Sequence, residues 1–141
     1  MEKLIIDKSI LNSGHLLCVT LDKKAGIFKI YGYMLENEQD ANNHFAIITK
    51  WINKYIMKPN VKTDFYFQFN YINTFGMKEV YNLIEKIRNI PNLNIYLVHD
   101  PDDEDAEELA SEISNYLNVN FVSKKVSLEY QELFFTNPYY I

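Results

Sequence analysis

Cysteine and histidine are scarce in this sequence. Cys18 is the only cysteine among 141 residues, which excludes an internal disulfide and a zinc site built from cysteines. It lies in the apolar run LLCVTL, so we expect a small buried side chain. His15, His44 and His99 show no ligand spacing, and each is interpreted as a structural or surface residue rather than as a metal ligand or a base.

Long apolar runs and clustered positive charge are also missing. No stretch reaches the about 18 consecutive apolar residues that a transmembrane helix requires. The opening MEKLIIDKS contains an acidic residue and only a short apolar run, unlike a signal peptide. The formal net charge is -5 and the lysines are scattered, which argues against nucleic acid as the main partner. We therefore expect a cytoplasmic protein that binds neither membranes nor nucleic acids.

Recognisable catalytic motifs are absent as well. The sequence has no Gly-rich phosphate loop, no HExxH motif and no Gly-x-Ser-x-Gly motif. No nucleophile or acid–base pair stands out. The sequence therefore predicts a protein that is not an enzyme, with no catalytic residue, no cofactor and no metal ion.

What is present suffices for one α/β domain. Apolar residues make up 48% of the chain and aromatic residues 15%. We expect, in chain order, a strand or ordered arm at 4–6, a hairpin of strands at 15–21 and 27–34, a helix capped by Asp40, a strand at 63–72, a helix from about Met77 to near Pro91, a strand at 93–99, a helix opening at 100–105 and a strand at 119–122. The order ββαβαβαβ predicts a mixed sheet, with an antiparallel hairpin followed by parallel βαβ units packed with helices.

The segment Phe65–Glu79 (FYFQFNYINTFGMKE) joins a strand to a helix. Aromatic residues alternate along its first half with the period of a strand, and apolar residues recur at helical spacing from Met77. Thr74 therefore carries a hydroxyl at a helix start, where unpaired N–H groups and the helix dipole favour a phosphate. Position alone favours the simpler interpretation of an N-cap or turn residue.

Four neighbours of Thr74 are candidate turn or contact residues. Asn73 and Gly76 are expected to shape the turn, because Asn bonds to nearby backbone and Gly tolerates close approach. Phe75 is a candidate partner contact, with a plug in the core as the alternative. Asn70 is expected on the outer or edge face of its strand.

The acidic run DPDDED at 100–105 opens the next helix. Consecutive acids on one helix start do not converge on a metal ion, and the spacing of a calcium loop is missing. Helix capping and solubility explain the run best, a partner-facing patch with Asp102 and Asp103 comes second, and a metal site third. If the strands at 63–72 and 93–99 are parallel, the run shares a sheet edge with Thr74. A phosphate there would add about two negative charges and weaken binding of a partner at that edge.

The C-terminal residues differ from the rest in composition. We predict a domain over 1–126 and a tail over 127–141 that is rich in aromatic side chains, namely Tyr130, Phe134, Phe135, Tyr139 and Tyr140. Such a tail is too apolar to be simply disordered. It is expected to pack on its own domain, with docking on a partner as the alternative.

Three motifs in order resemble the SiaC family of bacterial regulatory phosphoproteins. Gly26–Tyr33 (GIFKIYGY), followed by Glu36 and Asn37, is similar to the family's opening motif G-x-x-x-I-x-G-x-S-x-P-E-N. Asn70–Thr74 (NYINT) resembles its Y-x-N-T-S motif, and the acidic stretch Asp102–Glu108 with a last short strand keeps the family's order. The resemblance covers roughly residues 15–125.

The resemblance implies a fold akin to STAS-like, anti-sigma-factor-antagonist domains and reversible phosphorylation of the motif threonine, here Thr74. It implies a Ser/Thr kinase and a PP2C-type phosphatase that set the phosphorylation state. It also implies that the unphosphorylated form binds and activates a diguanylate cyclase, and so controls cyclic di-GMP and biofilm behaviour. Phe75 stands where the family usually has a small hydroxylic residue.

The leading prediction is thus a non-catalytic phospho-switch at Thr74. Two alternatives from other classes stay open. One is a module that binds a small molecule or nucleotide at the carboxyl ends of its strands. The other is a constitutive structural or assembly protein that oligomerises through its aromatic tail.

Overall fold

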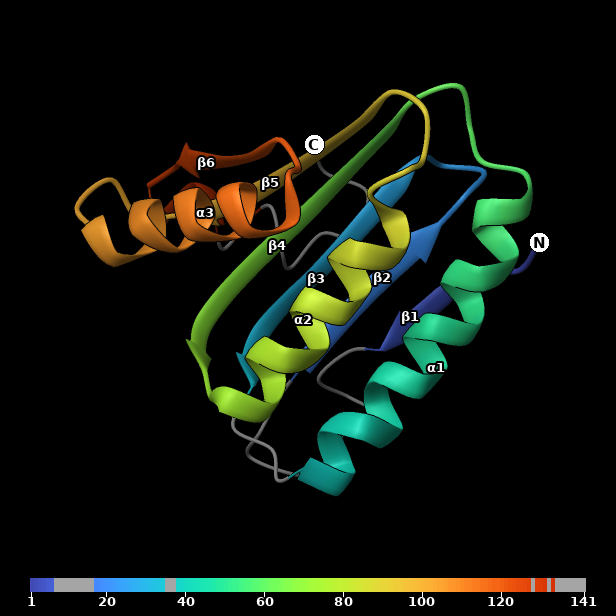
Figure 1. Cartoon of the computed structure of the whole chain (residues 1–141), viewed down its shortest axis with the longest axis horizontal. Coiled ribbons are helices and arrows are strands. Elements are labelled where there is room, and N and C mark those ends of the chain that lie inside the picture. Colours follow the sequence, from blue (N-terminus) through green and yellow to red (C-terminus); the bar gives the residue numbers. More distant parts are fainter. Residues whose placement is uncertain (7–16, 35–37, 128, 132, 134–141) are drawn as a thin grey trace.

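The computed structural model describes residues 1–6, 17–34, 38–127, 129–131 and 133. These residues form six strands and three helices, which Figure 1 shows in chain order. The elements are β1 (Leu4–Ile6), β2 (Leu17–Asp22), β3 (Ile27–Met34), α1 (Glu38–Met57), β4 (Thr63–Ile72), α2 (Thr74–Ile87), β5 (Leu93–His99), α3 (Glu104–Leu117) and β6 (Phe121–Lys125).

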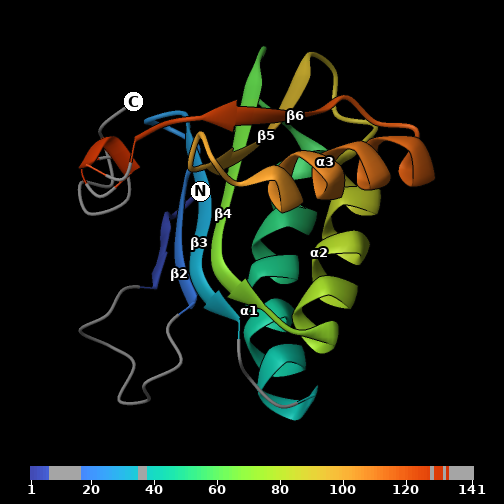
Figure 2. The same ribbon diagram turned by 90° about the vertical axis from the view of Figure 1, so that its left-hand side faces the viewer.

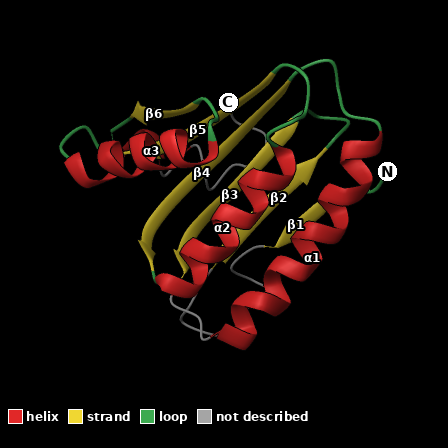
Figure 3. Ribbon diagram, viewed as in Figure 1, coloured by secondary structure: helices red, strands yellow, loops and turns green. Residues whose placement is uncertain are grey.

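The strands form one mixed sheet in the sequential order β1-β2-β3-β4-β5-β6. β1, β2 and β3 are antiparallel, and β3 to β6 are parallel, so the predicted mixed sheet is confirmed. Leu4–Ile6 pairs with β2 and is a strand rather than an arm. The three crossovers step in one direction across the sheet, and right-handed crossovers of that kind leave every helix on the same face. Figures 2 and 3 show α1, α2 and α3 as one layer against the sheet.

Several predicted boundaries were wrong. Asp40 does not cap α1, because the helix begins two residues earlier, where Glu38 and Gln39 are good helix formers. β6 spans 121–125 rather than 119–122. The polar residues SKK at its end do not have a strand pattern in the sequence, yet they pair with β5 in continuous register. No helix in the described ranges combines the length and apolarity needed to cross a membrane.

The alternation along β4 distributes its side chains between two faces. Phe65 and Phe67 are almost fully buried and pack in the cluster that includes the core residues of all three helices. Their rings stack at 5.0 Å, and Phe67 stacks on Phe121 of β6 at 5.9 Å. Tyr66 and Gln68 belong to the opposite face of the same strand, as the two-residue period predicts, and are also buried.

The described part of the C-terminal tail contacts the sheet face opposite the helices (Figure 2). Tyr130 packs against the cluster around Tyr66. The Gln131 side-chain amide donates to Asp100 Oδ1 at 2.9 Å and to the Val126 carbonyl at 3.0 Å. The division of the chain at residue 126 stays a prediction. Four aromatic residues of the tail lie outside the described residues, namely Phe134, Phe135, Tyr139 and Tyr140.

Candidate functional site

The junction of β4 and α2 makes Thr74 the first helical residue. Asn73, in an extended conformation (φ -91°, ψ 178°), is the N-cap. Its side-chain oxygen accepts a hydrogen bond from the Gly76 N–H at 2.9 Å, and its carbonyl oxygen accepts one from the Met77 N–H at 2.9 Å. The helix thus begins three residues before Met77, and the interpretation of Thr74 as the N-cap is wrong because Asn73 has that role. Thr74 is exposed.

The start of α2 is electrostatically suited to a negative charge. The first turn of α2 has no acidic residue, whereas the first turn of α3 has Glu104, Asp105 and Glu107. The first N–H groups of a helix have no partner inside it, and the helix dipole makes this end positive. A phosphate on the exposed Thr74 hydroxyl would therefore lie at a favourable end of α2.

The two residues after Thr74 have opposite environments. Phe75 is 42% exposed, so it is not the core plug that the sequence left open as an alternative. Gly76 is buried inside the first turn of α2, where its N–H makes the capping hydrogen bond. Thr74 and Phe75 together give this edge an exposed hydroxyl next to an exposed ring.

Asn70 is the extra residue of a β-bulge. The pair Gly32–Phe69 is followed by Tyr33–Tyr71, so β4 has one residue more than β3 at this point. Gly32 has φ 112°, a conformation that residues with a side chain rarely adopt. Bulges bend a strand and increase its twist, so the bulge sets the direction in which β4 enters α2. The side chain of Asn70 lies outside the described part of the structure.

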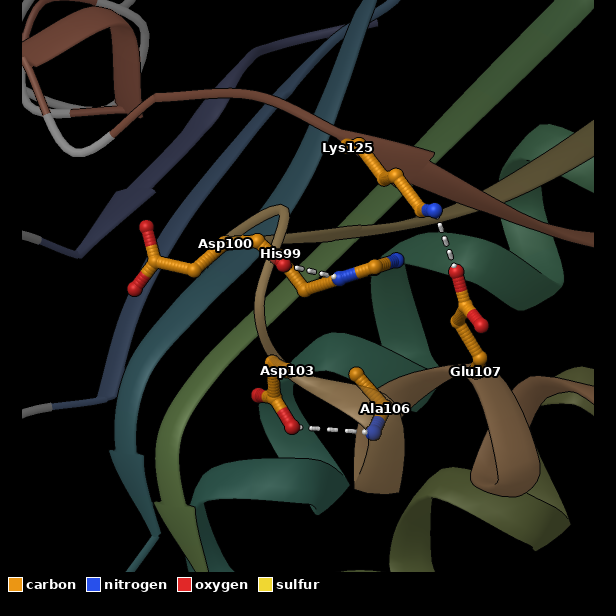
Figure 4. Close-up of polar contacts among 6 residues, drawn as sticks. All are labelled: His99, Asp100, Asp103, Ala106, Glu107 and Lys125. Carbon is orange, nitrogen blue, oxygen red and sulfur yellow. Dashed lines mark hydrogen bonds and ion pairs between the residues drawn. The ribbon is translucent and has the colours of Figure 1, made fainter.

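The acidic run caps and flanks the start of α3 (Figure 4). Asp103 is the N-cap, and its carboxylate accepts a hydrogen bond from the Ala106 N–H at 3.1 Å. Glu107 pairs with Lys125 of β6 at 2.9 Å. This hydrogen bond and the ammonium charge lower the pKa of the Glu107 carboxyl. The capping interpretation is confirmed for Asp103, and Asp102 is exposed in the turn before it.

His99 ends β5 and is 4% exposed. Its Nδ1 lies 2.7 Å from the Asp100 carbonyl oxygen, and its Nε2 has no hydrogen-bond partner among the described residues. Within the described ranges, no three His, Cys, Asp or Glu side chains are arranged to hold a metal ion. His44 is half-buried on α1, and His15 lies outside the described residues.

Thr74 and the acidic run share a sheet edge but are not neighbours. β4 and β5 are parallel, as predicted, with Phe67 opposite Leu97. β5 ends two residues after this pair, whereas β4 continues for five, to Ile72. The difference of three residues is about 10 Å of strand. Figures 1 and 2 both separate the start of α2 from the start of α3. Since the Debye length is about 8 Å at physiological salt, the run acts weakly on Thr74.

The comparison with protein families decides the classification. The model described as "SiaC family regulatory phosphoprotein" matches residues 15–126, which include the whole β4–α2 junction. The chain belongs to the SiaC family. A comparison with curated protein sequences gave no match.

Solved SiaC structures from Pseudomonas aeruginosa have the same fold. Apo-SiaC is 17% identical with a TM-score of 0.70, and the match covers 88% of this chain and 99% of that one. A structure of SiaC with the diguanylate cyclase SiaD, which describes SiaC as the activator of SiaD, gives 16% identity and a TM-score of 0.71 over 87% of this chain and 99% of that one. At such low identity the likeness establishes the fold alone. The STAS-like label stays a prediction.

The sequence did not predict one exposed surface of this SiaC-family chain. Tyr116 follows Ile113 at the spacing of the apolar residues of α3, yet it is 79% exposed. Its ring meets the ring of Tyr81 on α2 edge-on, with centroids 5.6 Å apart. Helical spacing cannot distinguish this position from a core position, because its exposure depends on where α3 passes α2. One residue in the sequence pointed to this surface. Lys78 follows Thr74 by four residues and so lies on the same face of α2 as the candidate switch.

Proposed function

We propose that this SiaC-family protein is a non-catalytic regulator switched by reversible phosphorylation of Thr74. Its unphosphorylated form binds and controls a diguanylate cyclase. A Ser/Thr kinase adds the phosphate and a PP2C-type phosphatase removes it. The observation that carries the proposal is the exposed Thr74 hydroxyl at the first position of α2, directly after the Asn73 cap.

The choice of partner rests on family membership. The family model describes regulatory phosphoproteins, and a SiaC from Pseudomonas aeruginosa is an activator of the diguanylate cyclase SiaD. This chain has the same fold and has an Asn-Thr pair where a strand meets a helix. A cyclase is therefore the first client to test.

The switch acts locally in this proposal. A phosphate adds close to two negative charges and three strong acceptors, and it carries a tightly held hydration shell. The adjacent Phe75 ring, 42% exposed, is the apolar contact that a partner would bury. Burying this ring beside a phosphate requires the partner to desolvate the charge, which is costly. The phosphorylated form therefore binds weakly, without help from the distant acidic run.

The modification is tested by co-expressing the protein with a Ser/Thr kinase from the same genome. Intact-mass measurement and peptide mapping should find one phosphate, on Thr74, and the Thr74→Ala variant should stay unmodified. A PP2C-type phosphatase should restore the original mass. Phosphate found only at other residues would contradict the proposal.

Binding is tested with the purified diguanylate cyclases of the same organism. The parent protein and Thr74→Ala should bind one of them and change its rate of cyclic di-GMP synthesis. The phosphorylated protein should bind at least tenfold more weakly. Equal binding by the two forms would disprove the switch, and the absence of binding to every cyclase would disprove the client.

A further inference from the structure

A shallow groove lies between α2 and α3. It has a volume of about 360 Å³ and is lined by Lys78, Tyr81, Asn82, Glu85, Tyr116 and Leu117. The edge-to-face pair of Tyr81 and Tyr116 forms its apolar part. Tyr81 also packs against the core, whereas Tyr116 is 79% exposed. A tyrosine held this far out of the core on a regular helix is a ready contact for a partner, because such rings bury a large area at little cost in side-chain entropy.

The groove lies on the same face of α2 as Thr74. Residues three or four apart are neighbours on a helix surface, and the series Thr74, Lys78, Tyr81 or Asn82, and Glu85 follows that spacing. Lys78 is thus one turn from the hydroxyl and also lines the groove. A partner that occupies the groove would reach the first turn of α2, where the phosphate is added.

The charges along the groove define what it accepts. Lys78 is its cation at the end near Thr74, and Glu85 is its anion one turn beyond the tyrosines. On α3, Glu112 is close enough to Tyr81 to contribute, with burial as the larger cause, to raising the pKa of that phenol. A complementary segment has an apolar or aromatic anchor in the middle, an acidic residue for Lys78 and a basic residue for the two glutamates.

We infer that the groove between α2 and α3 is the docking surface for such a segment of the client enzyme, and that Lys78 couples it to Thr74. This inference rests on the proposed function. An acidic group four residues before a lysine is the favourable order for a helical ion pair. Phosphate on Thr74 therefore pairs with Lys78, so that this ammonium no longer pairs with the client's acidic residue. The phosphate also places a second negative charge close to that acidic residue.

The test uses the diguanylate cyclase that the parent protein binds, and matched variants on exposed positions. Tyr116→Ala should weaken binding at least tenfold and Lys78→Glu at least fivefold. Met57→Ala, at an 86% exposed residue far along α1, and Lys86→Glu, at a lysine of α2 outside the groove, should stay within twofold of the parent. Circular dichroism confirms that each variant is folded.

A double-mutant cycle tests the coupling through Lys78. Thr74→Glu should weaken binding strongly in the parent and by a clearly smaller factor when Lys78→Met is already present, because only the desolvation of the charge beside Phe75 then remains. Full binding by Tyr116→Ala and Lys78→Glu would overturn the docking surface while leaving the phospho-switch intact. An undiminished effect of Thr74→Glu in the Lys78→Met background would overturn the coupling. If the parent binds no cyclase, the proposed function itself fails.

Discussion

Replacing Thr74 by glutamate should stabilise the fold although it weakens binding of the client. The first turn of α2 has no acidic residue, so a carboxylate at its first position meets an uncompensated helix dipole. Such a charge contributes about 0.3–1 kcal/mol at an exposed site at low ionic strength. For a domain of this size, the gain corresponds to a rise in melting temperature of about 1–4 °C.

The measurement is urea unfolding followed by circular dichroism at low salt and in 1 M NaCl. Thr74→Gln is the matched control, because glutamine has the length and helix propensity of glutamate without its charge. The Debye length falls to about 3 Å in 1 M salt, so the difference between the two variants should disappear there. Lys86→Glu, in the last turn of α2, should have the opposite sign and destabilise the protein.

Two results would refute this reasoning. Equal stability of Thr74→Glu and Thr74→Gln at low salt would mean that the dipole of α2 does not reach this side chain. A Thr74→Glu variant less stable than Thr74→Gln would mean that negative charge opens the start of α2. The switch would then act by unfolding a helix turn rather than by altering a contact surface.

Three further predictions concern the rest of the fold. Arg88→Ala removes a 3.2 Å hydrogen bond to the Leu117 carbonyl and should lower the free energy of unfolding, measured in urea, by about 1 kcal/mol; an unchanged value would show that water replaces this bond. Burial lowers the pKa of Lys29 to about 8, so the unfolded chain binds more protons between pH 8 and 9.5 and stability should rise with pH there. Urea titrations should show this rise in the parent and lose it in Lys29→Met; a rise that persists would point to another group. Gln131→Glu sets a carboxylate against Asp100, so limited proteolysis after residue 126 should accelerate at pH 7; an unchanged cleavage rate would show that this contact does not hold the segment.

Local side-chain patterns account for the parts of the fold that the sequence predicted. The alternation over 65–72 predicted β4, which has the expected bounds 63–72, because a strand separates successive side chains onto two faces. It did not reveal the bulge at Asn70. The run 93–99 predicted β5 equally well, since a strand paired on both sides is apolar almost throughout. Helix starts were harder to locate, because several residues near Asp40 or Met77 suit a first turn equally well and tertiary packing chooses among them.

The features missed by the sequence depend on contacts between distant elements. Ser123–Lys125 reads as a polar loop, yet it extends β6, and the ammonium of Lys124 lies 5.6 Å from the ring of Tyr66. Tyr116 has the spacing of a core residue and is nevertheless exposed. The distance between Thr74 and the acidic run was also hidden, because it depends on the register of β4 against β5, and neither segment reports that Thr63 pairs with Leu93.

Asn73 caps α2 and Thr74 is exposed for modification, and one residue could not do both. A capping side chain must keep its acceptor on the helix N–H groups, so modifying it would disturb the helix start. Asn73 makes that bond to Gly76, and the next residue is left exposed at the first helical position. Asn73→Ala should therefore cost about 1 kcal/mol of unfolding free energy, whereas Thr74→Ala should change it by less than about 0.5 kcal/mol. Urea unfolding of both variants checks this, and an equal cost would show that Thr74 serves the fold and is poorly suited to be a switch.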